Sequence, residues 1–375
     1  RRFLIIIFVI NSLIFTIKTT IMTLVVVLLV PFLFVFNEGL SNFAYREVGY
    51  YIVADKLQKN TSSDEEFLTK VVSYINQNIY PVGELQDKTT WNDLVIGQAW
   101  CDQVSRDVAE ILAKKNIPAR IIMDAGASHL VGEAFIDGKF RFYDAQNNYI
   151  FRNLSGELAT FEDVANGNID LKYSKISADI KSSEDLFELH PYLFKTDDDY
   201  DLKKYSGLVI DPAMGKNRWK VYTDVYGPMK NFISYLVWIN YTINPWFYGL
   251  YQDLFLGYYS KISAVHIGRN YELFGRYDKA LQFYNQSLMS ESSQEDGLFY
   301  IGRMFHDLGD YKKSINYLVE LLEHHPKTKW KDPSNYILGE SYELLGKGAS
   351  ARHYYNKSRK PYYGSSNKLF NKIYE

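Results

Sequence analysis

The sequence predicts three parts: an N-terminal membrane helix, an α+β domain in which one helix packs on an antiparallel sheet, and an all-α helical solenoid. The first 36 residues are almost continuously apolar. Between residues 98 and 143, a segment with helical periodicity is followed by short alternating segments around a hairpin turn. After residue 260, glycine and aromatic positions recur with a spacing of 34 and then 37 residues. The predicted boundaries are a membrane segment at 1–36, the α+β domain at 37–230 with its core at 91–151, a connector at 231–260 and the repeats at 261–375.

The N-terminal segment contains two apolar runs, at residues 3–17 and 21–36, separated by a short polar break. Because a helix needs about 20 apolar residues to cross a bilayer, each run alone is short. Two interpretations stay open, a signal peptide or signal anchor and a short helical hairpin. No small-residue cleavage motif is evident, which favours an uncleaved anchor. Arg1 and Arg2 indicate that this end stays in the cytoplasm, so the α+β domain is expected to be extracytoplasmic.

Two helices are expected before the sheet. Residues 67–79 have apolar side chains at helical spacing, and the acidic residues 64–66 suit the positive end of a helix dipole. Residues 98–115 show the same periodicity and end before Pro118, which is typical of a helix stop. Cys101, the only cysteine, therefore falls near a helix start. Backbone N–H groups and the helix dipole stabilise a thiolate there and can receive an oxyanion.

Three strands are predicted after this helix, at residues 119–123, 130–136 and 139–143. The last two are joined by Asp137-Gly138, a strong hairpin signal. His129 directly precedes one strand of this hairpin, and Asp144 directly follows the other. Because these two ends lie side by side in an antiparallel pair, we expect the imidazole and the carboxylate to be neighbours.

Cys101, His129 and Asp144 are the parts of an activated sulfur nucleophile. The imidazole takes the thiol proton, the carboxylate orients the imidazole, and the thiolate attacks a carbonyl. Each residue also has an ordinary structural role, as a small buried apolar side chain, a structural histidine and a turn residue. Their order, spacing and flanking residues together favour a catalytic site.

The stretch from about residue 91 to 151, roughly a sixth of the chain, resembles the transglutaminase-like superfamily, whose chemistry is papain-like. The residues that carry this resemblance are Cys101 at a helix start, the run Asn116-Ile117-Pro118-Ala119-Arg120, His129, the hairpin from Gly132 to Phe140, and the run Tyr143-Asp144-Ala145-Gln146-Asn147. The sequence departs from the usual pattern at Phe140, where a tryptophan is common, and at Ala145, where a proline is common.

The resemblance implies a papain/transglutaminase-like fold and a role for each site residue. Cys101 is the implied nucleophile, His129 the general base and acid, and Asp144 the group that orients the histidine. The family places an oxyanion-stabilising donor before the nucleophile, and Gln98 and the indole N–H of Trp91 are the candidates, beside the backbone N–H of Cys101. Whether the acyl-enzyme is hydrolysed or transferred to an amine stays open.

The connector at residues 232–259 is rich in tryptophan and tyrosine and carries no charge from Phe232 to Gln252. These features are typical of a membrane interface. Asn240, Asn244 and Pro245 weaken a plain crossing helix. A second membrane segment and an amphipathic or buried connector both stay open.

The C-terminal region repeats a pattern of small and aromatic residues that resembles the tetratricopeptide repeat. Three glycines head the aligned repeats, with large side chains at matching later positions: Gly268, Gly302 and Gly339, then Tyr284, Leu318 and Tyr355. Small residues let paired helices approach, and the large ones fill the seam between them. Such solenoids bind protein partners on a concave face, and a purely structural helical cap stays as the alternative.

Composition limits the function classes. The formal net charge is −2 and no basic block occurs, so nucleic-acid binding is not expected. Thiol chemistry of this kind implies no metal or organic cofactor. The acidic residues 197–201 lack the glycine and glutamate of a calcium loop, so a solvated acidic loop is the favoured interpretation. The first hypothesis is a membrane-anchored thiol enzyme acting on an amide or ester of a peptide or protein. The alternatives are a catalytically inactive scaffold of an envelope assembly and, less specifically, a subunit of an export system.

Overall fold

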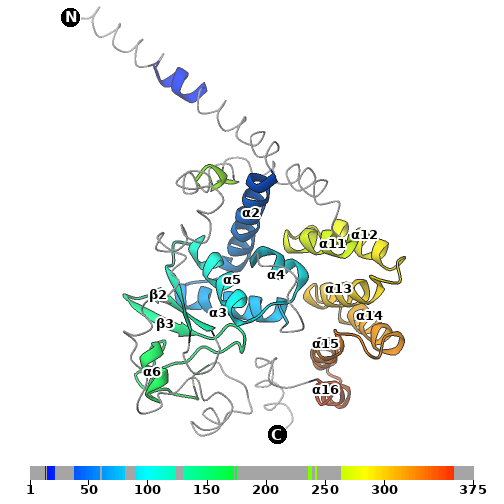
Figure 1. Ribbon diagram of the computed structural model, residues 1–375. Helices are drawn as coiled ribbons and strands as arrows, with labels where there is room; N and C mark the ends of the chain where they lie inside the picture. Colours follow the sequence, from blue (N-terminus) through cyan, green and yellow to red (C-terminus); the bar gives the residue numbers. More distant parts are fainter. Residues whose placement is uncertain are drawn as a thin grey trace, which may run out of the picture. The chain divides into compact units, whose positions relative to one another are not determined.

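The structure is a computed structural model, drawn in Figure 1. The parts of the chain that it describes are residues 13, 15–21, 38–59, 61–80, 90–123, 130–172, 174, 235–238, 241–242 and 263–358. The chain divides into two units. One consists of Arg1–Gly49 and Trp219–Ser260, and the other of Tyr50–Arg218 and Lys261–Glu375. The candidate site lies in the second unit.

The first unit contains the predicted membrane segment and the connector, most of which lie outside the described residues. Of positions 1–36, residues 13 and 15–21 are helical. Of positions 231–260, residues 235–238 and 241–242 are helical. Within the described ranges, no helix has both the length and the apolar character that a bilayer crossing needs. The membrane helix and the nature of the connector therefore stay predictions.

Before the repeats, the described residues form helices and one small sheet. In chain order these elements are α2 (Glu38–Gln58), α3 (Asp64–Asn78), α4 (Thr90–Ile96), α5 (Cys101–Ala113), β1 (Ala119–Met123), β2 (Leu130–Ile136), β3 (Lys139–Tyr143) and α6 (Phe161–Ala165). The described strands form a three-stranded antiparallel sheet in the order β1-β2-β3. The predicted strand positions and the predicted hairpin are confirmed.

The starts of α3 and α5 follow from their capping residues. The side chain of Ser63 accepts a hydrogen bond from the backbone N–H of Glu66 at 3.2 Å, which caps α3 ahead of its acidic first turn. The periodicity alone predicted a start at residue 98 for the next helix, but α5 begins at Cys101. Gly97 has a φ of 69° and Trp100 is extended, with φ −94° and ψ 171°, so the backbone cannot be helical before Cys101.

Different elements pack against the two faces of the sheet. Helix α5 packs against β1 and β2. On that face the ring of Tyr143 fills the space beside Gly132, where a Cβ would lie 2.0 Å from a ring atom. On the opposite face, the buried side chains of Val131 and Phe142 pack with Phe161 of α6. The alternation of side chains along β2 and β3 thus separates the α5 face from the α6 face.

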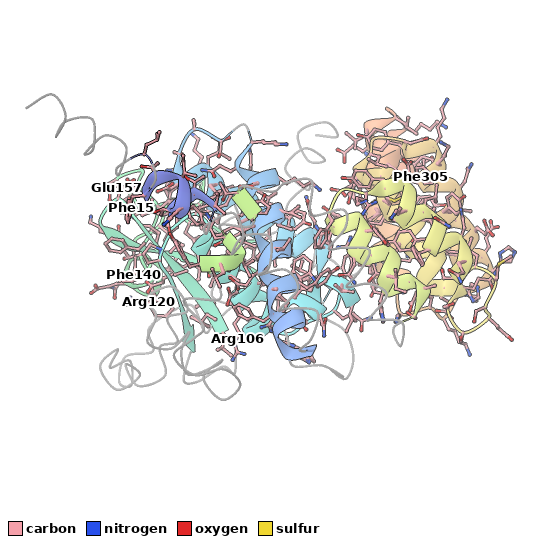
Figure 2. All side chains as sticks on the ribbon, turned by 90° about the horizontal axis from the view of Figure 1, so that it is seen from above. Phe15, Arg106, Arg120, Phe140, Glu157 and Phe305 are labelled. Atoms are coloured by element: carbon pink, nitrogen blue, oxygen red, sulfur yellow. The ribbon has the colours of Figure 1, made fainter. Side chains whose placement is uncertain are left out.

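Charged side chains hold the α6 face together. Arg120 lies 3.8 Å from the ring centroid of Phe140, and the two labelled side chains lie side by side in Figure 2. The same guanidinium pairs with the buried carboxylate of Glu133 at 2.5 Å. Glu133 also accepts from the backbone N–H of Phe161 at 3.4 Å, so this carboxylate joins the sheet to the start of α6.

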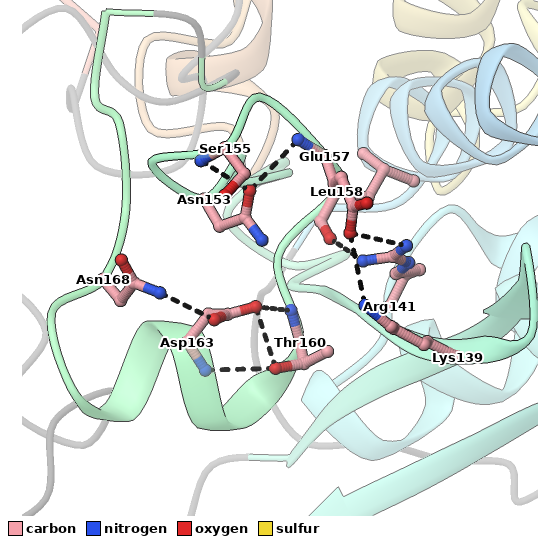
Figure 3. A network of polar contacts seen from close by, with 9 residues as sticks. All are labelled: Lys139, Arg141, Asn153, Ser155, Glu157, Leu158, Thr160, Asp163 and Asn168. Carbon is pink, nitrogen blue, oxygen red and sulfur yellow. Dashed lines mark hydrogen bonds and ion pairs between the residues drawn. The ribbon is translucent and has the colours of Figure 1, made fainter.

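A second polar network attaches the edge of β3 to the segment that follows it (Figure 3). The buried side chain of Arg141 donates to the carbonyl of Leu158 and lies 3.3 Å from the carboxylate of Glu157. Thr160 and Asp163 form a reciprocal capping box at the start of α6. These bonds fix the segment that lies against the end of β3.

Residues 263–358, the described part of the C-terminal region, form three pairs of helices. They are α11 (Ala264–Leu273) with α12 (Tyr277–Ser287), α13 (Gln294–Asp307) with α14 (Tyr311–His324), and α15 (Lys331–Leu344) with α16 (Gly348–Tyr355). In each pair a glycine of the first helix touches a large side chain of the second. A Cβ on these glycines would lie 2.5–2.6 Å from atoms of that side chain, in the pairs Gly268 with Tyr284, Gly302 with Leu318, and Gly339 with Tyr355. The predicted repeat architecture is confirmed down to these contacts.

Candidate functional site

The candidate nucleophile is the first residue of α5. Cys101 is 9% exposed, whereas the preceding Trp100 is 46% exposed. The side chain of Gln103 fixes this helix start, because its Oε1 accepts from the backbone N–H of Trp100 at 3.2 Å. Its Nε2 donates to Oδ1 of Asp93, in α4, at 2.9 Å. The side chain of Cys101 is thus held at a helix N-terminus.

One turn after Cys101, α5 contacts the beginning of β2. The hydroxyl of Ser105 donates to the carbonyl of Leu130 at 3.3 Å. Ser105 and Cys101 lie on the same side of the helix, because residues four apart are neighbours there. The hydroxyl of Tyr143, at the end of β3, donates to the carbonyl of Ser105 at 3.4 Å. The described contacts therefore bring together the turn after Cys101, the start of β2 and the end of β3.

His129 lies outside the described residues. It directly precedes Leu130, the first residue of β2 and the residue that Ser105 contacts. The pairing of the imidazole with Cys101 or with Asp144 therefore stays a prediction.

Asp144 directly follows β3 and is fully buried. Its backbone exchanges two hydrogen bonds with Tyr149, at 3.0 and 2.9 Å. Its Oδ1 accepts from the backbone N–H of Asn147 at 3.1 Å, and its Oδ2 accepts from Nδ2 of the same residue at 2.8 Å. In the register of the hairpin, Gly132 faces Tyr143, so Asp144 lies level with the first residues of β2.

Asn147 belongs to the run of residues that carries the family resemblance, but the sequence predicts no role for it. The structure shows that it binds both oxygens of the Asp144 carboxylate. The signal in the sequence is the spacing Asp-x-x-Asn after a strand, since aspartate side chains often accept bonds from the following turn. Asn147 therefore fixes the orientation of the carboxylate.

The two oxyanion candidates lie in different surroundings. The Nε2 of Gln98 is buried and finds no hydrogen-bond partner among the described residues. A buried donor without a partner is costly, and a ligand atom could satisfy it. The indole N–H of Trp91 donates instead to Oδ1 of Asn270, in α11, at 3.3 Å, and its ring is 1% exposed. The role of oxyanion donor stays a prediction for both residues.

Helix α5 carries a buried carboxyl group, Asp107, that the sequence did not indicate. Asp107 is fully buried and its Oδ1 accepts from the hydroxyl of Tyr50, in α2, at 2.6 Å. Burial raises the pKa of Asp107 well above its usual range, and the nearby charge of Asp93 raises it further. Asp107 lies on α5, six positions after Cys101. Its hydrogen bond with Tyr50 therefore attaches α5 to α2.

Within the described ranges, no group of three or more histidine, cysteine, aspartate and glutamate side chains could hold a metal ion. The expectation that the site needs no metal or organic cofactor stays a prediction, because His129 lies outside those ranges.

Comparison with known proteins identifies one part of the chain. Residues 296–328 match the tetratricopeptide repeat family. This segment contains most of α13 and all of α14, so the match confirms the predicted repeat. No curated protein and no solved structure matches the chain. Tetratricopeptide repeats generally mediate interactions between proteins, which is consistent with a protein partner.

Proposed function

We propose that this chain is a membrane-anchored, transglutaminase-like thiol enzyme that acts on an amide or ester carbonyl of a peptide or protein. The hydrogen bond from Ser105 to Leu130 is the observation that carries the proposal. It attaches the helix that begins at Cys101 to the strand that His129 precedes. The buried carboxylate of Asp144, held by Asn147, lies at the end of the adjacent strand.

The reaction would proceed through a thioester. His129 takes the proton of Cys101, and Sγ attacks the carbonyl carbon. The oxyanion that forms accepts hydrogen bonds from Nε2 of Gln98 and from the backbone N–H of Cys101. The C–N or C–O bond then breaks, and His129 gives its proton to the leaving amine or alcohol. Water or a second amine then attacks the thioester carbonyl and gives a proton to His129. The C–S bond breaks, and the thiolate takes this proton back from the imidazole, which Asp144 keeps oriented.

The membrane part of the proposal rests on the apolar residues 1–36. Positive charge at the N-terminal end favours an anchor with the site on the extracytoplasmic side. A substrate in an envelope compartment would fit this placement.

The first test measures the rate of Cys101 alkylation by iodoacetamide against pH in the full chain, with and without His129→Ala. We expect fast alkylation on a plateau that extends below the ordinary thiol pKa of about 8.5, because the imidazole and the helix start stabilise the thiolate. His129→Ala should abolish this plateau. His324→Ala, at an exposed histidine of α14, is the matched control and should leave it intact. The proposal would be contradicted by an alkylation rate that depends on pH as for an ordinary thiol and does not change with His129→Ala.

An inactive interaction protein is the second candidate function. The matched repeat at residues 296–328 favours it, since such repeats bind proteins without catalysing reactions. In that case Cys101→Ala would leave the biological function intact, whereas the enzyme hypothesis requires its loss.

A further inference from the structure

The segment that leads into the Cys101 helix is held by side chains of the repeats. The guanidinium Nε of Arg269, in α11, donates to the carbonyl of Leu94 at 3.2 Å. The hydroxyl of Tyr300, in α13, donates to the carbonyl of Ile96 at 2.6 Å. Gly97 follows immediately, and a Cβ at this position would lie 2.6 Å from the same hydroxyl. Two repeat residues therefore bind the backbone seven and five positions before Cys101.

Arg269 is fixed in place before it reaches this backbone. It is 1% exposed, and its Nη1 pairs with Glu272 at 2.6 Å, while its Nη2 donates to Oδ1 of Asn78 at 2.6 Å. Arg303 pairs with the same Glu272 carboxylate at 2.5 Å. Because a buried guanidinium with its partners in place has little freedom, it can act as a rigid support for the carbonyl of Leu94.

Aromatic contacts extend the same attachment along the first helices of the repeats. The ring of Trp91 lies 6.0 Å from that of Phe274, edge to face. The ring of Tyr80 lies 5.7 Å from Phe299 and 6.0 Å from Trp330. Rings from the segment before α5 therefore pack against residues of the repeats.

From this segment a continuous set of hydrogen bonds leads to the candidate nucleophile. The carbonyl of Asp93 accepts from the N–H groups of Gly97 and Gln98, at 2.8 and 3.3 Å. Its side chain accepts from Gln103, which in turn accepts from the backbone N–H of Trp100. A shift of the segment would therefore move both the oxyanion candidate Gln98 and the start of α5.

We propose that Tyr300 and Arg269 are positioning residues for Cys101. The repeats would then help to hold the thiol site in its geometry. The inference rests on the proposed function for its catalytic meaning. Neither residue touches the reacting atoms. Both act through the backbone of residues 94–100, and a protein that binds the repeats could change the reactivity of Cys101 by shifting this segment.

The test compares Tyr300→Phe with Tyr355→Phe in the full chain. Both substitutions remove only a buried hydroxyl of the repeats, and the hydroxyl of Tyr355 donates to Glu343, within its own repeat, at 2.6 Å. We expect Tyr300→Phe to raise hydrogen exchange of the amides of residues 97–100 by about tenfold, since the carbonyl of Ile96 loses a buried partner. Alkylation of Cys101 below pH 7 should slow by about fivefold, with the pH midpoint moving toward that of an ordinary thiol. Tyr355→Phe should change neither.

Two results would overturn the inference. One is a Tyr300→Phe protein whose exchange and alkylation profile match those of the wild type. The other is an equal effect of Tyr355→Phe, which would indicate a general loss of repeat stability. The two proposals remain separable. If the alkylation of Cys101 in the wild type has the pH dependence of an ordinary thiol, the proposed enzyme is refuted. Hydrogen exchange of the amides of residues 97–100 still decides whether the repeats hold this segment.

Discussion

At the scale of single residues, the contacts around Cys101 show which features local sequence can predict. A helix start near Cys101 and the place of Asp144 after a strand both follow from periodicity and turn signals within about 20 residues. The surroundings of Trp91 do not, because its partner Asn270 lies 179 positions away. The same holds for Asp107, whose partner Tyr50 lies 57 positions before it. Pairings of this kind are set by tertiary packing, which a single sequence does not reveal.

Substitution of Gln98 can distinguish a role in stabilising the oxyanion from a role in holding the structure of the site. We expect Gln98→Ala to lower the rate of acyl transfer from p-nitrophenyl acetate by about 10²–10³-fold, because one donor to the oxyanion is removed. Alkylation of Cys101 by iodoacetamide should stay unchanged, since that reaction forms no oxyanion at the site. The measurement is the rate of p-nitrophenol release beside the alkylation rate of the same preparation.

Gln103→Ala serves as the comparison for this variant. Gln103 binds the helix start to Asp93, so its loss should slow both reactions. If Gln98→Ala behaves like Gln103→Ala and slows both, Gln98 is a structural residue and not an oxyanion donor.

At the scale of elements, alternation and turn signals predicted the three strands at their observed residues. The hairpin is determined locally, since Asp137 and Gly138 both adopt positive φ, at 52° and 77°. The short helix α4 was not predicted. It has seven residues, and its position depends on contacts with α5 and α11 rather than on a long apolar period. The repeat helices were predictable because the same small and large residues recur.

The glycines of the repeats provide a stability test of this element packing. We expect Gly302→Ala to lower the free energy of unfolding by about 1–3 kcal/mol, because the new Cβ would meet Leu318 in a filled seam. The distance from that Cβ to Cγ of Leu318 would be 2.6 Å. Asn316→Ala, at an exposed position of α14, is the control and should have little effect. Chemical denaturation measures both.

A double-mutant cycle makes this test specific. Leu318→Ala alone should cost about 2–5 kcal/mol through the cavity that it leaves. In the protein with both changes, the new Cβ at position 302 would occupy part of that cavity, so the combined loss should be smaller than the sum of the two single losses. Strict additivity would mean that the close contact of Gly302 with Leu318 is not what makes a larger side chain unfavourable there.

At the scale of the whole molecule, the first helices of the repeats share a buried surface with the segment before Cys101. Tyr80 is central to it, because its ring contacts Phe299 and Trp330 while its backbone N–H donates to the carbonyl of Gly97 at 2.8 Å. The sequence predicted a catalytic-type domain and repeats as separate parts. It could not predict that the two parts share this buried surface, because no local pattern marks residues 80 and 299 as neighbours.

This shared surface should make the two parts unfold together. In the wild type, we expect the slowest amides of α5 and α13 to exchange with the same free energy and the same dependence on denaturant, because a single unfolding event exposes both helices.

Tyr80→Ala removes a buried aromatic ring, a change that costs about 3–5 kcal/mol in comparable cores. The two free energies should then separate, because each part can open alone. Phe135→Ala, on a side chain that is 40% exposed on the sheet, should leave them equal. Hydrogen exchange followed by mass spectrometry measures all three proteins, and helices that already open independently in the wild type would show that the repeats are a separate domain after all.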